Sequence, residues 1–258
     1  MATILFNEIV FGPIKSRRLG SSLGVNLLPK FGKWCSFDCI YCECGWNKDG
    51  KKDTTLPTKE EVYEALDTRL HALRAEGTPV DTITFSGNGE PTMHPNFAEI
   101  IDFTLELRNK LYPDAKVSVL SNASQLGRKE VRDALEKVDN PILKIDSPLQ
   151  WMVDAINIPN AAYSLEDAIN NIKLFNHNFI LQTMFLKGVE NGVEIDCTEK
   201  EHVLAWQNLV RELAPREVMM YTIDRETPAR NLQKVTVEEM EQIAAPLVKE
   251  GFNIQIRG

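Results

Sequence analysis

The residues most suited to chemistry are three cysteines that lie within one short segment. The segment runs Cys35-Ser-Phe-Asp-Cys39-Ile-Tyr-Cys42, so three and then two residues separate the thiols. Three thiolates on one loop can each bind one iron of a [4Fe–4S] cubane and leave the fourth iron open to a small chelating molecule. The spacing therefore indicates an iron–sulfur cluster with Cys35, Cys39 and Cys42 as its ligands.

Zinc is the alternative metal that the spacing leaves open. A structural zinc ion takes four ligands, which normally come from two separated pairs. Cys44 is the nearest further cysteine, but the chain has no second Cys-x2-Cys pair, and His71, His94, His177 and His202 lie far away in the sequence. We therefore favour the cluster and expect neither Cys44 nor any histidine to be a ligand.

Further polar and glycine-rich residues follow short apolar runs. These segments are Ser86-Gly87-Asn88-Gly89-Glu90-Pro91-Thr92, Ser121-Asn122-Ala123-Ser124, Lys144-Ile145-Asp146-Ser147-Pro148 and Tyr221-Thr222-Ile223-Asp224-Arg225. In a barrel of parallel strands, the loops that follow the strands build the active site. The pattern predicts that these segments meet the cysteines at one end of such a barrel.

The elements that would position these residues alternate along most of the chain. Apolar runs predict strands over 24–28, 80–85, 116–120, 142–145, 179–186 and 218–222, and a closing strand over 252–256. Amphipathic stretches predict helices over 58–75, 97–111, 129–138, 164–175, 198–213 and 237–249. Thr58 and Glu61 form a capping-box pattern at the first helix. We expect Pro246 to bend the last helix or to end it early.

Strand–helix units in strict alternation predict a parallel sheet. Their number is typical of a partial (β/α)6-type TIM barrel within the α/β class, and a doubly wound open sheet is the alternative. We find no internal repeat, low-complexity segment or linker. The sequence therefore predicts a single domain over 1–258, with a core over about 20–225 and a C-terminal helix and strand over 236–257.

The composition and charge favour some classes of protein and disfavour others. The chain of 258 residues is 43% hydrophobic and 26% charged, which is typical of soluble globular proteins. Its net charge of −8 disfavours nonspecific nucleic-acid binding, although Arg17, Arg18, Lys30 and Lys33 form one basic stretch. An odd number of cysteines, five in all, argues against a disulfide framework. We see neither a membrane span nor a signal peptide and expect a cytoplasmic protein.

The cysteine segment, with Tyr41 before its last cysteine, resembles the signature of the radical S-adenosylmethionine (SAM) superfamily. The turn from Gly87 to Glu90 is similar to the GGE motif of that superfamily, with Asn88 between the two glycines. The strings GPIKSRRLGSSLGVNLLP, CSFDCIYCE and SGNGEPT are similar to the branch that contains the wyosine tRNA-base synthases. This resemblance spans residues 11 to 225 and implies a partial TIM barrel of the radical SAM kind.

The resemblance also implies cofactors and a reaction. The cofactors would be one [4Fe–4S] cluster and SAM, and an electron donor such as flavodoxin or ferredoxin would reduce the cluster. Reductive cleavage of SAM would release a 5′-deoxyadenosyl radical that takes a hydrogen atom from a substrate. The wyosine synthases carry additional N-terminal cysteines for a second cluster, whereas residues 1–34 contain none. We therefore expect a single cluster.

Site roles are carried over residue by residue from the matching motifs. The resemblance implies that Cys35, Cys39 and Cys42 bind iron, Tyr41 packs on the adenine, Asn88, Gly89 and Glu90 bind the methionine amino group, Asn122 contacts the methionine carboxylate, and Lys144, Asp146 and Ser147 contact the ribose. A carboxylate suits an ammonium group, and glycine lets the backbone approach a ligand closely.

The sequence also offers candidate residues for binding a substrate. Gln182, Tyr221 and Arg225, on the late strands, and Arg17 and Arg18, before the first, are candidate substrate-binding residues. The substrate classes that stay open are an RNA base, a partner protein as for the glycyl-radical-enzyme activating proteins, and a small metabolite. The non-enzyme alternative is a zinc-binding or iron–sulfur scaffold protein.

Overall fold

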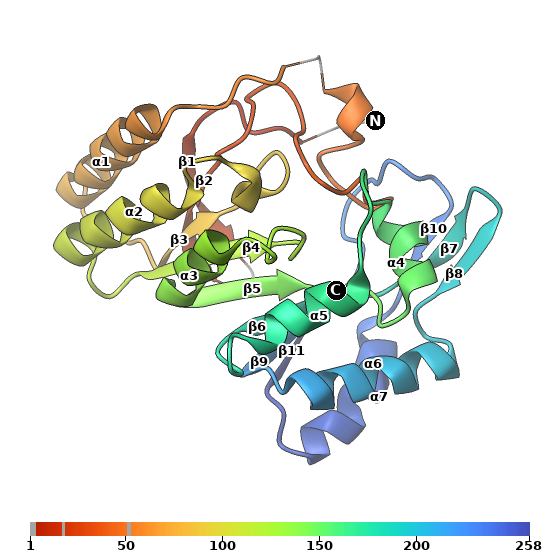
Figure 1. Cartoon of the computed structure of the whole chain (residues 1–258). Helices are drawn as coiled ribbons and strands as arrows, with labels where there is room; N and C mark the ends of the chain where they lie inside the picture. Colours follow the sequence, from red (N-terminus) through yellow and green to blue (C-terminus); the bar gives the residue numbers. More distant parts are fainter. Residues whose placement is uncertain (1–3, 17–18, 51–52) are drawn as a thin grey trace.

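The computed structural model describes residues 4–16, 19–50 and 53–258. Its main sheet has the spatial order β1 (Val10–Ser16), β2 (Gly20–Val25), β3 (Thr82–Phe85), β4 (Lys116–Ser121), β5 (Asn140–Lys144), β6 (Ile180–Met184), β9 (Glu217–Tyr221) and β11 (Ile254–Arg257). Neighbours from β2 to β11 are parallel, and β1 is antiparallel to β2. The two ends of this order do not pair within the described chain, so the sheet is an open, curled half-barrel (Figure 1).

This architecture confirms the predicted α/β class and partial barrel. The six predicted strands correspond to β2, β3, β4, β5, β6 and β9, and the predicted closing strand is β11. The first strand begins and ends earlier than the predicted 24–28, because its residues pair with β1 in an antiparallel hairpin. Sequence reasoning missed β1, whose residues show no regular alternation of buried and exposed positions.

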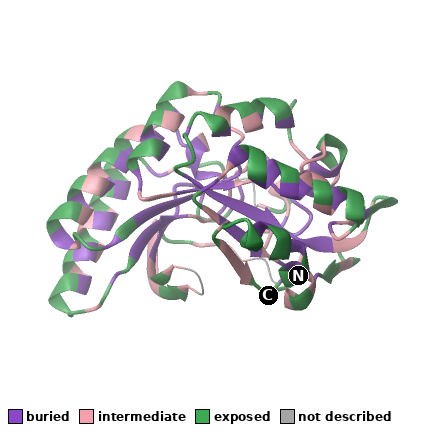
Figure 2. Cartoon of the chain, turned by 90° about the horizontal axis from the view of Figure 1, so that it is seen from below, coloured by how far each residue is buried: buried purple, intermediate pink, exposed green. Residues whose placement is uncertain are grey.

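Helices connect the parallel strands and cover the outer face of the sheet. They are α1 (Lys59–Ala75), α2 (Phe97–Leu111), α3 (Lys129–Lys137), α4 (Gln150–Asn157), α5 (Leu165–Lys173), α6 (Lys200–Leu213) and α7 (Val237–Lys249). Figure 2 shows the central strands of the main sheet buried beneath these helices, whose outer faces are largely exposed. On α1, Val62, Leu66, Leu70 and Leu73 repeat at helical spacing and are all buried. No helix within the described ranges is long and apolar enough to cross a membrane.

Two helix ends test the predicted local signals. Thr58 and Glu61 form the predicted capping box, in which the side chain of each accepts a hydrogen bond from the backbone N–H of the other. α7 extends over the predicted 237–249, so of the two effects expected of Pro246, a bend or an early end, the early end does not occur. Ile243 and Leu247 are buried on either side of this proline, and their packing holds the last turn in place.

A second, smaller sheet was not predicted. It has the antiparallel order β10 (Leu232–Lys234), β7 (Leu186–Glu190) and β8 (Val193–Asp196). The turn between β7 and β8 is Asn191-Gly192, and both residues have positive φ angles, 50° and 77°. Asn-Gly between two β-prone runs is the usual signal of a two-residue hairpin, so the sequence did contain a cue for these strands.

Candidate active site

Four cysteines line one pocket at the carboxyl ends of the parallel strands. This pocket has a volume of about 170 Å³ and is lined by Lys33, Cys35, Cys39, Tyr41, Cys42, Cys44, Gly87, Gly89, Glu90, Leu120, Ser121, Asn122, Lys144, Gln182 and Tyr221. We refer to it as the cysteine pocket. Its lining comes from the cysteine loop and from the ends of β3, β4, β5, β6 and β9. The prediction that the polar strand-end segments meet the cysteines is therefore confirmed.

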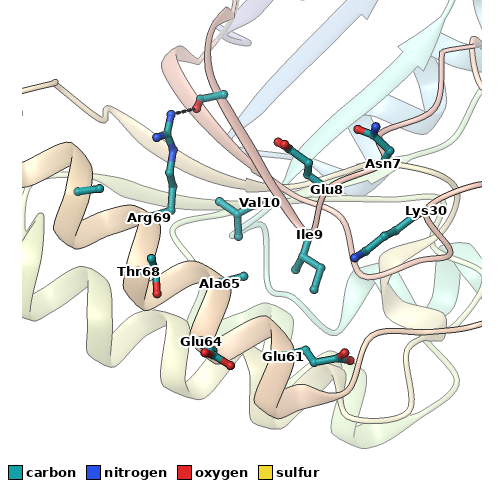
Figure 3. Close-up of a pocket in the computed structure, with 12 residues that line it drawn as sticks. Asn7, Glu8, Ile9, Val10, Lys30, Glu61, Glu64, Ala65, Thr68 and Arg69 are labelled. Carbon is teal, nitrogen blue, oxygen red and sulfur yellow. Dashed lines mark hydrogen bonds between the residues drawn. The ribbon is translucent and has the colours of Figure 1, made fainter.

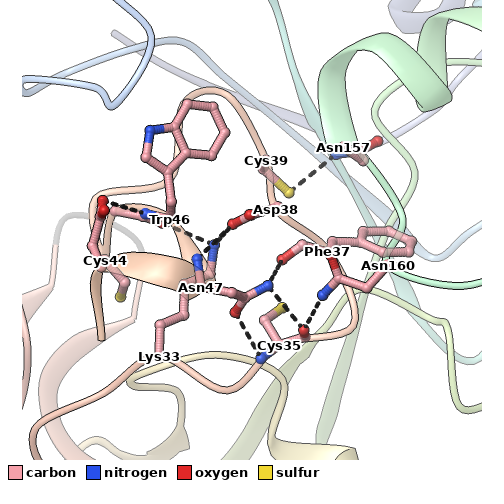
Figure 4. A network of polar contacts seen from close by, with 12 residues as sticks. Lys33, Cys35, Phe37, Asp38, Cys39, Cys44, Trp46, Asn47, Asn157 and Asn160 are labelled. Carbon is pink, nitrogen blue, oxygen red and sulfur yellow. Dashed lines mark hydrogen bonds and ion pairs between the residues drawn. The ribbon is translucent and has the colours of Figure 1, made fainter. Parts of the chain in front are cut away.

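Two side chains hold the cysteine loop in shape (Figure 4). The ammonium group of Lys33, whose side chain is 1% exposed, donates hydrogen bonds to the Gly45 carbonyl at 2.9 Å and to the Asp38 carboxylate at 3.1 Å. The Asn47 amide binds both the backbone N–H and the backbone carbonyl of Cys35, each at 3.2 Å. These contacts tie the start of the loop to its end, so the thiols are positioned by the protein itself.

Three polar side chains donate hydrogen bonds to the cysteine sulfurs. Lys144 Nζ and Asn157 Nδ2 each lie 3.4 Å from Cys39 Sγ, and Asn122 Nδ2 lies 3.6 Å from Cys35 Sγ. Nearby cations and hydrogen-bond donors favour the thiolate, which is the form of cysteine that binds metal. Asn157 belongs to α4, a helix that sequence reasoning missed, so its role had no signal in the sequence.

Burial and hydrogen bonding together set the pKa values of the thiols. Desolvation raises the pKa of Cys35 to about 12 and also raises the pKa of Cys39. A hydrogen bond from Cys44 lowers the pKa of Cys42 to about 6, and the same bond raises the pKa of Cys44. Thiols that are buried and protonated at neutral pH must release protons when they bind metal. Metal loading of this loop is therefore coupled to proton release.

Across the described ranges, no three His, Cys, Asp or Glu side chains come close enough together to hold one metal ion. A zinc ion needs all its ligands to converge on one atom, whereas a cubane binds each thiolate through a different iron.

The glycine turn after β3 docks directly on the cysteine loop. The Trp34 N–H donates to the Asn88 carbonyl at 2.8 Å, and the Glu90 N–H donates to the Trp34 carbonyl at 3.1 Å. Between them, Gly89 has a φ of 141°, and a Cβ atom there would collide with the Trp34 carbonyl. Only glycine permits this close approach of two backbones.

Glu90 is fixed in place by hydrogen bonds from two backbone N–H groups. Its carboxylate accepts hydrogen bonds from the Thr92 N–H at 3.1 Å and the Asn122 N–H at 2.6 Å, and the residue is 2% exposed. Desolvation raises the pKa of the carboxyl group, while these hydrogen bonds oppose the shift. A buried, oriented carboxylate in the lining of the pocket can bind a cationic group such as an ammonium.

The Asn88 side chain does not line the cysteine pocket and instead binds backbone groups of Phe6 and Pro29. Its amide donates to the carbonyls of Pro29 at 2.7 Å and Phe6 at 2.8 Å, and it accepts from the Phe6 N–H at 2.8 Å. This residue is fully buried and is not among the lining residues of the cysteine pocket. The Asn88 side chain therefore secures the N-terminal segment, while its backbone N–H donates to Asn26 Oδ1 and its carbonyl accepts from the Trp34 N–H, so the structure does not bring Asn88 into the pocket as predicted.

Lys144, Asp146 and Tyr41 form one buried network. The Tyr41 hydroxyl donates to the Asp146 carboxylate, and Lys144 Nζ lies 2.7 Å from the Tyr41 hydroxyl and 3.1 Å from Asp146. Asp146 also accepts from the Asn157 amide at 2.6 Å and the Met184 N–H at 3.1 Å. Both Asp146 oxygens are thus occupied, and Asp146 lies beneath the pocket rather than in its lining.

Ser147 also turns inward. Its hydroxyl accepts a hydrogen bond from the Leu149 N–H at 3.1 Å, and the residue is fully buried. Of the three residues predicted to contact the ribose, Lys144 alone therefore lines the cysteine pocket, while Asp146 and Ser147 support it from below.

Two further pockets continue from the cysteine pocket into the half-barrel. Their volumes are about 310 and 280 Å³, and both share Gln182 and Tyr221 with the cysteine pocket. We refer to them as the inner pockets. Arg225 lines both of them and forms an ion pair of 2.6 Å with Glu43, a residue that sequence reasoning missed although it directly follows Cys42. The predicted substrate residues Gln182, Tyr221 and Arg225 are thus brought together beside the cysteines.

The predictions for Arg17 and Arg18 lie outside the described residues. The neighbouring Lys15 and Leu19 do line the 310 Å³ inner pocket, so the β1–β2 hairpin reaches the mouth of that pocket.

A larger hollow of about 740 Å³ lies between α1 and the segment that leads into β1 (Figure 3). It is an open groove with acidic and basic walls, and Arg69 crosses it to donate a hydrogen bond to the Gly12 carbonyl at 2.6 Å. The groove shares no lining residue with the cysteine pocket. We therefore assign the chemistry to the cysteine pocket and the inner pockets.

Several curated proteins are similar in sequence over most of this chain. A UPF0026 protein of Synechocystis sp. is 31% identical, covering 87% of this chain and 78% of its own length. A UPF0026 protein of Methanocaldococcus jannaschii is 28% identical over 92% of this chain and 70% of its own length. A protein named GTPase Obg from Brachyspira hyodysenteriae is 29% identical over 90% of this chain, which spans 32% of that relative.

Solved structures share the fold. A radical SAM methyltransferase from Sphaerobacter thermophilus is 15% identical, with a TM-score of 0.66 over 92% of this chain and 65% of its own. SuiB of Streptococcus suis bound to S-adenosylmethionine is 14% identical, with a TM-score of 0.64 over 91% of this chain, which spans 50% of SuiB. Archaeal TYW1 is 15% identical, with a TM-score of 0.51 over 88% of this chain and 71% of its own. The family model described as the Radical SAM superfamily matches residues 30–196, and the chain belongs to this superfamily.

Proposed function

We propose that this radical SAM enzyme cleaves SAM reductively at one [4Fe–4S] cluster bound by Cys35, Cys39 and Cys42, and that its substrate occupies the inner pockets. The observation that carries the proposal is the shared lining of the cysteine pocket, where these thiols meet the Glu90 carboxylate at the carboxyl ends of the parallel strands. When bound, the cluster and SAM supply a 5′-deoxyadenosyl radical that abstracts hydrogen from the substrate.

The protein side chains would hold this machinery in place. Lys144 and Asn157 donate to the sulfur of Cys39 and stabilise its charged form. The Glu90 carboxylate, oriented by the Asn122 N–H, would bind the methionine ammonium through a charge-assisted hydrogen bond. Tyr41 and Lys144 line the same pocket and would form the wall beside the nucleoside end of SAM.

The inner pockets give the substrate a place next to the radical. They share Gln182 and Tyr221 with the cysteine pocket, so a molecule bound there lies beside the site of SAM cleavage. A radical requires a site that excludes water. Enzymes that activate glycyl-radical proteins or modify tRNA bases would use the same cysteine pocket and differ in what enters the inner pockets.

Reduction of the cluster requires an external electron donor, for which we propose a small carrier such as flavodoxin or ferredoxin. Cys35 and Cys42 are only partly buried, which leaves the cysteine loop within reach of the protein surface.

Anaerobic purification followed by metal analysis and product assay tests the proposed function. We expect about four iron and four sulfide ions per chain. We also expect slow formation of 5′-deoxyadenosine and methionine when dithionite and SAM are added. The Cys39→Ala variant should lose both the cluster and the products. Stoichiometric zinc without iron, or a full cluster that never cleaves SAM, would refute the proposal.

A further inference from the structure

Basic side chains gather around the 310 Å³ inner pocket, although the chain as a whole carries a net charge of −8. Three of the side chains that line this pocket are cationic and one is anionic, namely Lys15, Arg225, Arg257 and Glu43. The larger hollow beside α1 has the opposite balance, with two cationic and three anionic side chains, namely Lys30, Arg69, Glu8, Glu61 and Glu64. The excess of positive charge is therefore a local property of the inner pocket.

The cations of this pocket come from elements that lie far apart in the chain. Lys15 belongs to β1 and Arg257 to β11, the two ends of the strand order of the main sheet, and Arg225 follows β9. Arg257 pairs in register with Tyr221, which also lines the cysteine pocket, and it donates to the Ile256 carbonyl at 3.0 Å. Because residues of both end strands line one pocket, the basic side chains frame it at the open side of the half-barrel.

Arg225 is oriented by an ion pair that uses one of its nitrogens. Nη1 donates to the Glu43 carboxylate at 2.6 Å, and the two side chains are 56% and 42% exposed. Arg225 makes no other hydrogen bond to the residues that the structure describes. The edge formed by Nε and Nη2 matches two oxygens of a carboxylate or a phosphate. Glu43 directly follows Cys42, so the ion pair holds this guanidinium beside the cysteine loop.

The balance of charge selects an anionic group as the ligand. An oxyanion would accept charge-assisted hydrogen bonds from Arg225 and Lys15, and such bonds are stronger than those between neutral groups. An ammonium group would be repelled, because the cations outnumber the one lining carboxylate. The volume of about 310 Å³ lies at the lower end of the range of small-molecule sites. The rest of the wall includes both hydroxyl and apolar side chains, so it restricts the body of the molecule little.

We propose that the substrate is a small molecule that carries an oxyanion, either a carboxylate or a phosphate, and that Arg225 and Lys15 bind this group in the 310 Å³ pocket. The rest of the molecule would extend to Gln182 and Tyr221, which this pocket shares with the cysteine pocket. The proposal rests on the proposed function and deepens it by naming the substrate class.

Three probe molecules test the class of ligand. Cluster-loaded protein saturated with SAM is titrated with benzoate, with phenyl phosphate, and with benzamide, the neutral counterpart of benzoate, and saturation-transfer NMR measures binding. The wild type should bind at least one of the two anions roughly fivefold more tightly than benzamide. The anion that binds more tightly identifies the group as a carboxylate or a phosphate. Equal affinity for benzamide and both anions would refute the proposal.

Two substitutions with opposite expected effects test Arg225. Arg225→Gln should weaken binding of the preferred anion roughly tenfold, because it removes a charge-assisted hydrogen bond. Glu43→Gln keeps an acceptor for Arg225 but removes the lining carboxylate, so it should strengthen binding roughly twofold to threefold. Arg211→Gln is the control, since Arg211 forms an ion pair of 2.8 Å with Glu250 and lines none of these pockets. Weaker binding in both pocket variants, or unchanged binding in Arg225→Gln, would overturn the proposal.

SAM affinity and an RNA probe separate the remaining alternatives. A loss of SAM binding in Arg225→Gln as large as in Glu90→Ala would assign Arg225 to the SAM site and overturn the proposal. Tighter binding of a short uridine oligonucleotide than of either small anion would place the oxyanion on RNA and overturn the small-molecule class. Failure of the proposed function would appear differently, as wild-type protein that holds no iron but still binds the anions more tightly than benzamide.

Discussion

Within the cysteine pocket, four thiols share one small space but have different surroundings. Cys35 and Cys39 receive N–H donors from Asn122, Lys144 and Asn157. Cys44 lies 3.4 Å from the Gly87 carbonyl and also hydrogen-bonds Cys42. Two thiols of the cysteine motif therefore receive N–H donors from outside the loop, whereas Cys44 contacts Cys42 and the glycine turn.

This difference predicts how single cysteine variants behave. Replacing Cys35, Cys39 or Cys42 by alanine should abolish cluster binding, since each would supply the only bond to one iron. Cys44→Ala and Cys197→Ala should retain at least about four-fifths of the iron of the wild type, measured by metal analysis after anaerobic reconstitution. Iron loss in Cys44→Ala as severe as in Cys42→Ala would contradict the three-ligand assignment.

A second prediction concerns Lys33 and the midpoint potential of the cluster. Its buried ammonium lines the cysteine pocket and ties Asp38 to Gly45. A positive charge there stabilises the more negative, reduced form of a cluster. Lys33→Met should therefore lower the midpoint potential by tens of millivolts, where about 59 mV corresponds to a tenfold change for one electron.

An EPR-monitored redox titration measures this shift. Lys33→Arg, which keeps the charge, should move the potential less than Lys33→Met does. Lys30→Met removes an exposed charge in the same part of the chain and serves as the control. A potential that stays at the wild-type value in Lys33→Met would show that Lys33 only braces the loop.

At the scale of elements, the site depends on contact between two connecting segments. The turn after β3 and the loop after β2 meet through backbone hydrogen bonds between Trp34, Asn88 and Glu90. Both segments leave neighbouring parallel strands at the same end, so the sheet brings them together. The glycine at the contact allows the two backbones to touch, and this contact orients Glu90 relative to the thiols.

Gly89→Ala tests this contact. The added methyl group would clash with the Trp34 carbonyl and would strain a backbone with a φ of 141°. We expect a loss of roughly 3 kcal/mol in the free energy of unfolding, together with weak cluster binding. Gly127→Ala is the control, because nothing lies within 4 Å of its Cβ position. Denaturant unfolding measures both variants, and similar stability of the two would argue against a tight backbone contact.

At the scale of the whole molecule, a buried histidine links folding to pH. His94 Nδ1 accepts from the Asn96 N–H at 3.1 Å, and Nε2 lies 2.9 Å from the Pro57 carbonyl, so the ring is neutral and Nε2 carries the proton. Burial lowers the pKa of His94 below its usual value of 6.5. The unfolded chain therefore binds a proton near pH 6.5 that the folded chain does not bind.

The pKa shift of His94 predicts the direction in which stability changes with pH. The contribution of His94 to stability is fully present above about pH 6.5 and is lost as the pH falls toward its folded pKa, at up to about 1.4 kcal/mol per pH unit. Between pH 7.5 and 5.5, wild-type protein should therefore lose more stability than His94→Gln, as measured by urea unfolding. Parallel curves for the two proteins would show that His94 does not titrate on unfolding.

Local patterns were sufficient for much of the fold and for the metal ligands. The spacing of Cys35, Cys39 and Cys42 and the glycines around Asn88 are features of continuous segments, and so are the apolar repeats of α1. A helix or strand that buries one face must show the corresponding period, which is why the alternation of elements predicted the sheet. The sequence missed β1 and α4, which lack a strong period, and it missed the meaning of Asn191-Gly192 in the small sheet.

The sequence by itself determined the superfamily motifs, the order of the strands and the end of the barrel that carries the site. Only the tertiary structure decided how the polar side chains are used. It fills both oxygens of Asp146 and turns the Asn88 amide toward Phe6. The physical reason is that hydrogen-bond partners far apart in the chain meet only through the curl and register of the sheet. Asn157 contacts the sulfur of Cys39 across 118 positions in the sequence, a distance over which no local pattern carries information.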